Sequence, residues 1–360
     1  MLFEIVVTRL TGISDTKYYQ RGYLDIPGFW GNFQPNTIAD IGSTQLSTAI
    51  TAKIGELMNP FFFGNPILIN IGFQSLAFLG LVYLINSLEG RARTIMAFLL
   101  LLPSFTLWTS IASKEAVVTM GMGFLLGSLA RSYAGRRWYG VLPLIGVCII
   151  FVYKIQYFVS FFYVFSAIYI CRYFRQKAAV ALMGGLFSLL PLYLFRDVID
   201  ALSFKVQLMI VIGPGARTTR AEMFFVDQYD VFVKFFEGMF RSFFGPTIEE
   251  VFISPLHLVT FTESVLIIGV FLVLLIGRMK SLPVYSFVVG VFSFFWIMFV
   301  NYPFGVMNPG SAIRYRSGWI LFILFVVAFL MSRETYVRWR NREPAVRRQS
   351  VASVKQAFQD

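Results

Sequence analysis

Repeated apolar runs of membrane-spanning length constrain the fold of this chain more than any other feature. A helix needs about 20 consecutive apolar residues to cross a bilayer. Runs of roughly that length predict about nine spans: Pro66–Leu88 and residues 94–111, 115–131, 138–153, 156–171, 178–195, 258–277, 282–300 and 317–332. The composition agrees, because 57% of the 360 residues are hydrophobic and only 14% are charged. The sequence therefore predicts an all-α protein, a polytopic bundle of transmembrane helices.

The segments outside these spans include two further helical patterns. Ser43–Met58 alternates small, apolar and polar residues, which suits a helix lying at the membrane interface. Phe232–Phe244 is amphipathic, with aromatic residues on one side and charged residues on the other; such a helix either anchors the chain or forms a wall of a lipid-binding groove. The predicted organisation is an external segment with an interfacial helix (1–65), transmembrane helices (66–195), an external loop with an amphipathic helix (196–254), further transmembrane helices (255–332) and a basic cytoplasmic tail (333–360).

The distribution of basic residues predicts how the bundle is oriented. Alternate loops and the tail carry 17 of the 31 basic residues but only four of the 19 acidic ones. Cytoplasmic loops are enriched in Lys and Arg, so this side is predicted to be cytoplasmic. The basic charge is thus a topology signal, and we find no nucleic-acid-binding pattern in it. The external segment 1–65 then requires either a preceding helix, which we favour, or direct translocation of the N-terminus.

Several ionisable residues fall on the predicted external side. Positive charge in short external loops runs against the orientation rule, and ionisable groups at membrane depth are costly. These residues are therefore candidates for a functional site: Asp15, Lys114, Glu115, Lys154, Arg217, Arg220, Arg314 and Arg316. The alternatives are an ion pair between Lys114 and Glu115, and snorkelling of Lys154 to the membrane surface.

The stretch Asn301–Arg316 is predicted to be a short external loop. The residues that predict a break between two helices are Pro303, Pro309 and Gly310. Ser311 is placed to cap the second helix, whose first turns carry Arg314 and Arg316. Two guanidinium groups beside the positive end of a helix favour a docked anion such as phosphate, whereas either arginine alone could snorkel to a lipid headgroup. Since residues two apart diverge on a helix, we expect one arginine to dominate, and we choose Arg314.

The residue types count against several classes of chemistry. The two cysteines lie in apolar runs, and the single histidine, His257, begins another. Neither a disulfide framework, a metal site nor a Ser-His or Cys-His nucleophile is indicated. The sequence also lacks a glycine-rich nucleotide-binding motif. We therefore expect no metal and no cofactor.

The remaining chemistry suits a substrate with an anionic head and a long apolar tail, such as a sugar linked to polyprenyl phosphate or diphosphate. Basic groups would hold the phosphate and stabilise charge that develops on the leaving group. A carboxylate, Asp15 in preference to Glu115, would take the proton from the acceptor hydroxyl. The carrier already holds an activated bond, which agrees with the lack of a nucleotide motif.

Three short patches occur in order along the chain: Asp15 with Tyr18 and Tyr19; Pro103, Trp108, Ser110, Lys114 and Glu115; and Gly310, Arg314, Tyr315 and Arg316 as Gly-x-x-x-Arg-Tyr-Arg. Their order resembles bacterial polytopic enzymes of cell-surface polysaccharide assembly, namely GT-C-type glycosyltransferases and exopolysaccharide or O-antigen polymerases. The resemblance implies an enzyme of the bacterial inner membrane that uses polyprenyl-linked saccharides, with membrane lipids and other assembly proteins as partners. It also adds Tyr315 to the substrate-binding residues.

Two features depart from the GT-C pattern. Residues 1–14 contain no apolar run of spanning length, and no paired Asp-x-Asp or Glu-x-Asp occurs in the sequence. The polymerases, which use external arginines and need no metal, therefore match this chain better.

Two alternatives belong to other classes of protein. A transporter or flippase of an anionic glycolipid should line a path across the bilayer, yet almost no charged residue falls in the middle of a predicted span. The other alternative is a non-catalytic subunit of a polysaccharide export complex.

Overall fold

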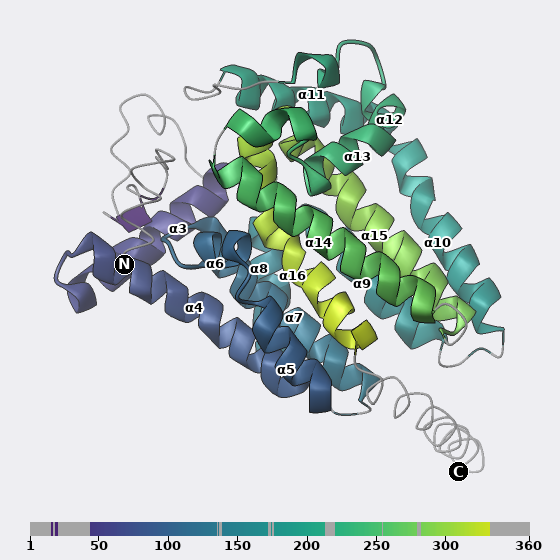
Figure 1. The fold of residues 1–360 in the computed structure, drawn as a ribbon, viewed down its shortest axis with the longest axis horizontal. Helices are drawn as coiled ribbons and strands as arrows, with labels where there is room; N and C mark the ends of the chain where they lie inside the picture. The colour runs from purple at the N-terminus through teal and green to yellow at the C-terminus, as the bar shows by residue number, and fades with distance from the viewer. Residues whose placement is uncertain are drawn as a thin grey trace. The chain divides into compact units, whose positions relative to one another are not determined.

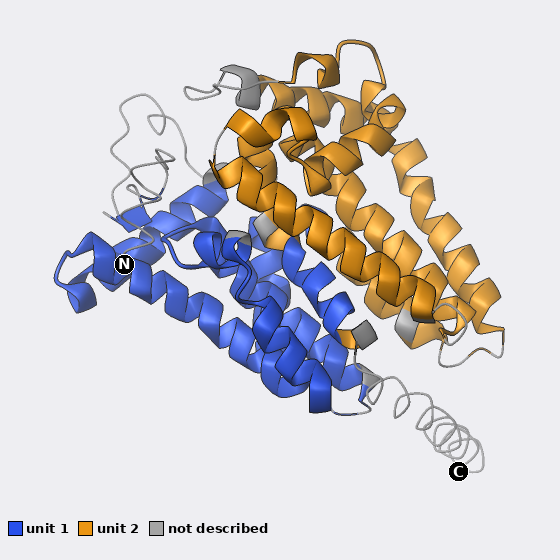
Figure 2. Cartoon of the chain, viewed as in Figure 1, with its two compact units in different colours: residues 1–158, 320–328 blue, residues 159–319, 329–360 orange. Residues whose placement is uncertain are grey.

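The computed structural model describes residues 16, 19–20, 44–134, 136, 139–171, 174, 176–212, 220–253, 255–278 and 282–331. Regular structure in this part of the chain is helical and includes no strand, which confirms the prediction of an all-α protein. The chain divides into two compact units, one of residues 1–158 and 320–328 and the other of residues 159–319 and 329–360 (Figure 2). Two helices contain a boundary between the units: α9 (Ile155–Cys171) and α16 (Pro309–Met331).

The first unit is built around α7. Its elements (Figure 1) are α3 (Thr44–Met58), η2 (Asn59–Phe62), α4 (Pro66–Ser87), α5 (Gly90–Leu99), α6 (Pro103–Thr109), α7 (Lys114–Tyr133) and α8 (Val141–Tyr153). Helix α7 packs along α4 and also along α8. Its side chains from Lys114 to Ala130 are almost all buried. Protein therefore surrounds α7, which explains why a helix with Ser, Thr and three Gly residues is stable there.

Glycine residues bring the backbones of α4 and α7 into contact. A β-carbon built on Gly123 of α7 would lie 2.4 Å from backbone atoms of Gly80 in α4. One built on Gly80 would lie 2.5 Å from the backbone of Met120. Small residues allow such close approach in membrane proteins, where helix packing replaces the hydrophobic effect as the driving force.

The second unit has α15 at its centre. Its elements are α10 (Lys177–Leu194), α11 (Arg196–Ile212), η3 (Ala221–Met223), α12 (Asp230–Val233), α13 (Phe235–Phe244), η4 (Ile248–Ile253), α14 (Pro255–Arg278) and α15 (Val284–Gly305). Helix α15 packs against α10 and α13. The Trp296 indole N–H of α15 donates to Ser188 Oγ of α10 at 2.9 Å. On its other side, α15 packs Phe299 and Phe295 against Phe235 of α13, with ring centroids 6.2–6.3 Å apart.

Four described helices are long and apolar enough to cross a membrane: Pro66–Ser87, Lys177–Leu194, Pro255–Gly277 and Val284–Gly305. A fifth span results if α16 counts as one, because its halves Pro309–Arg316 and Gly318–Phe329 meet at an angle of 56°. Helices α8 and α9 are apolar but shorter. These lengths are compatible with a multi-pass membrane protein, as the sequence predicted.

Two predicted helices are interrupted in the structure. The expected span 94–111 is not one helix, because α5 ends at Leu99 and α6 begins at Pro103. Leu102 has a ψ of 129°, as expected for a residue that precedes a proline. The amphipathic stretch 232–244 is divided at Lys234 into α12 and α13.

We expect Gly123→Ala to lower the free energy of unfolding by about 1–3 kcal/mol, because the new methyl group meets main chain that cannot rotate away. The matched control is Gly184→Ala in α10, where a β-carbon meets nothing within 4 Å. Alanine's higher helix propensity should leave that variant unchanged or stabilise it by about 0.5–1 kcal/mol. Tryptophan fluorescence during denaturant unfolding of the purified proteins measures both effects. Equal stability of the two variants would contradict the close contact of α4 with α7.

Candidate functional site

The structure separates the candidate residues into two groups. Lys114, Glu115 and Lys154 belong to the first unit. The candidates in the second unit are Arg220, Arg314, Tyr315 and Arg316. Asp15 and Arg217 lie outside the described residues.

The turn between α6 and α7 places Lys114 and Glu115 at the start of α7. Ser113 caps this helix, since its Oγ accepts the N–H of Ala116 at 3.2 Å and donates to the Trp108 carbonyl at 2.9 Å. Lys114 and Glu115 are the first two residues of the helix and only 8% and 3% exposed. The helix dipole favours the negative charge of Glu115 there. Lys114 Nζ donates to Ser47 Oγ of α3 at 3.0 Å.

Asn70 of α4 fixes this turn from the opposite side. Its Oδ1 accepts the backbone N–H of Ala112 at 2.8 Å and the Nε2 group of Gln20 at 3.1 Å. Asn70 is only 2% exposed. The sequence prediction did not include this residue, although a carboxamide inside the apolar run Pro66–Leu88 is a usable signal, because buried polar groups need partners.

Lys154 is the one residue between α8 and α9. Its N–H donates to the Ile150 carbonyl, and its own carbonyl accepts the N–H of Tyr157, both at 2.8 Å. The helix therefore breaks at Lys154, where the sequence predicted a tight turn. Lys154 is buried, at 9% exposure. Its side chain therefore does not extend freely away from the protein, as the snorkelling alternative would suggest.

Helix α3 brings the two corners of the first unit together. The hydroxyl groups of Thr51 in α3 and Tyr153 in α8 are hydrogen-bonded at 3.3 Å. Thr51 also donates to the carbonyl of Ser47 one turn earlier, at 2.6 Å, and Ser47 contacts Lys114. These hydrogen bonds link Ser47, Thr51, Lys114 and Tyr153. We group them with three other buried polar residues of this unit and call the set the polar cluster: Ser47, Thr51, Asn70, Lys114, Glu115, Tyr153 and Lys154.

The polar cluster combines groups that can act on an anionic substrate. Its two lysines supply positive charge, and its hydroxyl and amide groups supply hydrogen bonds. Glu115 supplies a carboxylate. Ionisable residues buried among apolar helices are costly, so they are functional candidates by default.

Arg220 holds the second unit together. Its guanidinium donates to both carboxylate oxygens of Glu250, at 2.6 and 2.7 Å. A third nitrogen donates to the Val306 carbonyl at 3.1 Å and the Arg241 carbonyl at 3.3 Å. The backbone N–H of Arg220 donates to the Met307 carbonyl at 2.8 Å. Arg220 therefore ties η4, α13 and the turn after α15 to one another.

The ion pair also sets the protonation of Glu250. Burial disfavours the charged carboxylate, but hydrogen bonds from Arg220 and Thr247 outweigh it and lower the pKa of Glu250. Glu250 is thus ionised at neutral pH, and its charge neutralises Arg220.

Arg316 forms a second buried ion pair. Its guanidinium donates to Glu263 Oε2 of α14 at 3.0 Å, and it also contacts Ser264 Oγ and the Thr260 carbonyl. The side chains of Arg316 and Glu263 are 3% and 7% exposed. Glu263 lies within the membrane-capable segment Pro255–Gly277. The expectation that almost no charge falls in the middle of a span therefore missed this pair.

Arg314 and Tyr315 differ from Arg316 in their surroundings. Both are half-buried, and the Tyr315 ring lies 5.6 Å from that of Phe304. Arg316 is buried and binds the carboxylate of Glu263, whereas Arg314 is half-buried.

The loop that carries these arginines is shorter than the sequence indicated. Helix α15 continues through Pro303 to Gly305, and α16 already begins at Pro309. A proline inside a helix costs one hydrogen bond but does not always end it. The cap of α16 is Asn308 and not Ser311, since Asn308 Oδ1 accepts the N–H groups of Gly310 at 2.8 Å and Ser311 at 3.2 Å.

Comparison with known proteins leaves the family of the chain open. No protein-family model, curated protein or solved structure matches it. Within the described residues, no group of three or more His, Cys, Asp or Glu side chains could hold a metal ion.

Proposed function

We propose that this chain is a multi-pass enzyme of the bacterial inner membrane that transfers sugars from polyprenyl phosphate or diphosphate carriers at the external face, in exopolysaccharide or O-antigen synthesis. The full proposal includes about nine spans, interfacial positions for α3 and for α12 with α13, and a cytoplasmic C-terminal tail. The polar cluster of the first unit is its main support.

The burial of Lys114 and Lys154 carries the proposal. Each lysine is less than a tenth exposed, and the Lys114 amine donates to the Ser47 hydroxyl. Ammonium groups buried this deeply are stabilised by an anion beside them. We therefore place the phosphate at the lysines and keep Arg314 and Tyr315 as secondary candidates.

Each group has a role in the transfer. The acceptor hydroxyl attacks the anomeric carbon of the sugar, the bond from that carbon to the carrier phosphate oxygen breaks, and the carrier leaves with the electron pair. Lys114 and Lys154 stabilise the negative charge on the departing phosphate. Glu115 takes the proton of the acceptor hydroxyl, the role that the sequence assigned first to Asp15.

We expect Lys114→Met to slow sugar transfer by roughly 10- to 150-fold, the effect of losing one charge-assisted contact of about 1.5–3 kcal/mol. In a deletion strain that carries this variant, surface polysaccharide sized on a gel should lose its long chains. The control is Lys53→Met in α3, since Lys53 is 63% exposed and pairs only with Glu56 among its described contacts.

The same gel separates the alternatives. Loss of long chains with surviving single units indicates a polymerase, and total loss indicates a glycosyltransferase that acts earlier. Unchanged polysaccharide in the deletion strain would contradict the proposal. A purified protein that moves the lipid-linked sugar across vesicle membranes without transferring it would be a flippase.

A further inference from the structure

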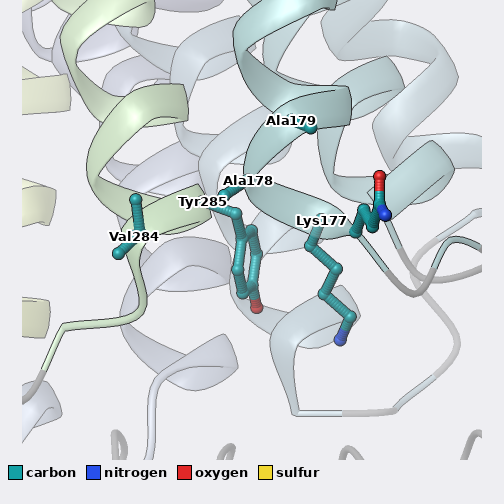
Figure 3. A pocket seen from close by; sticks show the side chains of 6 residues that line it. Lys177, Ala178, Ala179, Val284 and Tyr285 are labelled. Atoms are coloured by element: carbon teal, nitrogen blue, oxygen red, sulfur yellow. The ribbon is translucent and has the colours of Figure 1, made fainter.

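A pocket lies in the second unit where α10 and α15 begin. Its volume is about 440 Å³. The residues that line it (Figure 3) are Gln176, Lys177, Ala178, Ala179, Val284 and Tyr285. Both helices are membrane-capable and pack side by side. Since both start at the pocket, it lies where two adjacent spans meet a membrane face.

The polar side of the pocket is positively charged. Lys177 Nζ lies 5.3 Å from the ring centroid of Tyr285. Figure 3 shows the lysine amine and the tyrosine hydroxyl directed to the same side of the two helices. The residues that line the pocket include no acid, and the first turns of α10 and α15 carry none.

The opposite side of the pocket is apolar. Ala178, Ala179 and Val284 form its wall. Exposed apolar side chains continue along both helices away from the pocket: Leu182, Leu186, Phe287 and Val291, each 43–51% exposed. A ligand that fills this site needs an anionic head next to a hydrocarbon chain.

We propose that this pocket binds the headgroup of one anionic phospholipid, with its phosphate at Lys177 and Tyr285 and an acyl chain along α10 and α15. Basic pockets between spans on the cytoplasmic side are suited to such headgroups. The chain next to the pocket is basic in sequence on both sides, with Arg172, Arg175, Arg278 and Lys280. A free phosphate shares the headgroup chemistry, but it would leave the apolar wall without a partner, so we assign the site to a lipid. This site is separate from the proposed transfer reaction.

The test is binding of phosphatidylglycerol to the purified full-length chain, measured by native mass spectrometry. We expect Lys177→Gln to weaken binding by about fivefold, since one basic residue near a membrane surface contributes about 1 kcal/mol. The matched control is Lys205→Gln, because Lys205 is an exposed lysine of the same unit. A photoreactive phosphatidylglycerol should crosslink to the first turns of α10 and α15 in the wild-type protein.

Each contrary outcome overturns the assignment. Equal losses for Lys177→Gln and Lys205→Gln would mean general attraction to positive charge and no specific site. If phosphatidylcholine binds as strongly as phosphatidylglycerol, the negative charge of the headgroup does not determine binding. Full displacement of the lipid by glycerol 3-phosphate would make this a site for a soluble phosphate. Crosslinks confined to other helices would place the lipid elsewhere.

Discussion

Glu263→Gln should destabilise the protein by about 3–5 kcal/mol, one of the two largest effects that we expect. The substitution removes the charge of Glu263 and leaves Arg316 buried without its counter-ion, which is the costly way to break a buried ion pair. The side chains of both residues are less than a tenth exposed, so water cannot replace the lost partner. Denaturant unfolding of the purified variant measures the loss.

A double variant distinguishes a structural role of the Glu263–Arg316 ion pair from a role of Arg316 in substrate binding. Replacing both charges, as Glu263→Leu with Arg316→Met, should restore most of the stability, because apolar residues of similar volume often replace a buried pair at little cost. A double variant as unstable as Glu263→Gln would show that the two side chains do not act as a pair. Sugar transfer by a folded double variant would also exclude Arg316 as the phosphate clamp that the sequence suggested.

Arg220→Ala should also cost about 3–5 kcal/mol. It leaves Glu250 without its bidentate partner and removes the hydrogen bonds to the carbonyls of Val306 and Arg241. Arg220→Lys keeps the charge but loses the fork geometry, so it should recover only part of the stability. The control is Arg241→Ala, since Arg241 pairs with Glu222 and Glu237, which are 58% and 61% exposed, and such exposed pairs contribute little.

The pH dependence of stability checks the same ion pair. The pKa of Glu250 is lowered in the folded protein from its usual value of 4.5. Its contribution is therefore fully present above about pH 4.5 and is lost as the pH falls through the lowered pKa. Wild-type stability should fall more steeply than that of Glu250→Gln over this acidic range. Parallel curves would contradict the role given to Glu250.

The helices that the sequence predicts best are those with long uninterrupted apolar runs. The expected spans 66–88 and 178–195 agree with α4 and α10 within one residue at each end. Run length alone decides these elements, because the membrane fixes the length of a span. The rules for helix-breaking prolines and for helix-capping residues were less reliable at the turn before α16. Pro303 remained inside α15, and Asn308 took the capping role expected of Ser311.

The candidate site was predictable only in part. The sequence predicted that Lys114, Glu115 and Lys154 lie next to helix ends, because charged residues between two apolar runs mark a break between helices. Their partners were not found, since Ser47 and Lys114 are 67 residues apart in sequence. The pairing of Glu263 with Arg316 also depends on tertiary packing and has no local signal.

The contact of Gly80 with Gly123 also limits how the polar cluster can move. Because backbone lies against backbone there, α4 and α7 can neither slide nor rotate past each other without separating, and they behave as one rigid body. The turn with Lys114 is at the end of this body and is also held by Asn70 of α4. Any opening of the cluster to admit a substrate therefore has to come from α3 or from the α8–α9 corner.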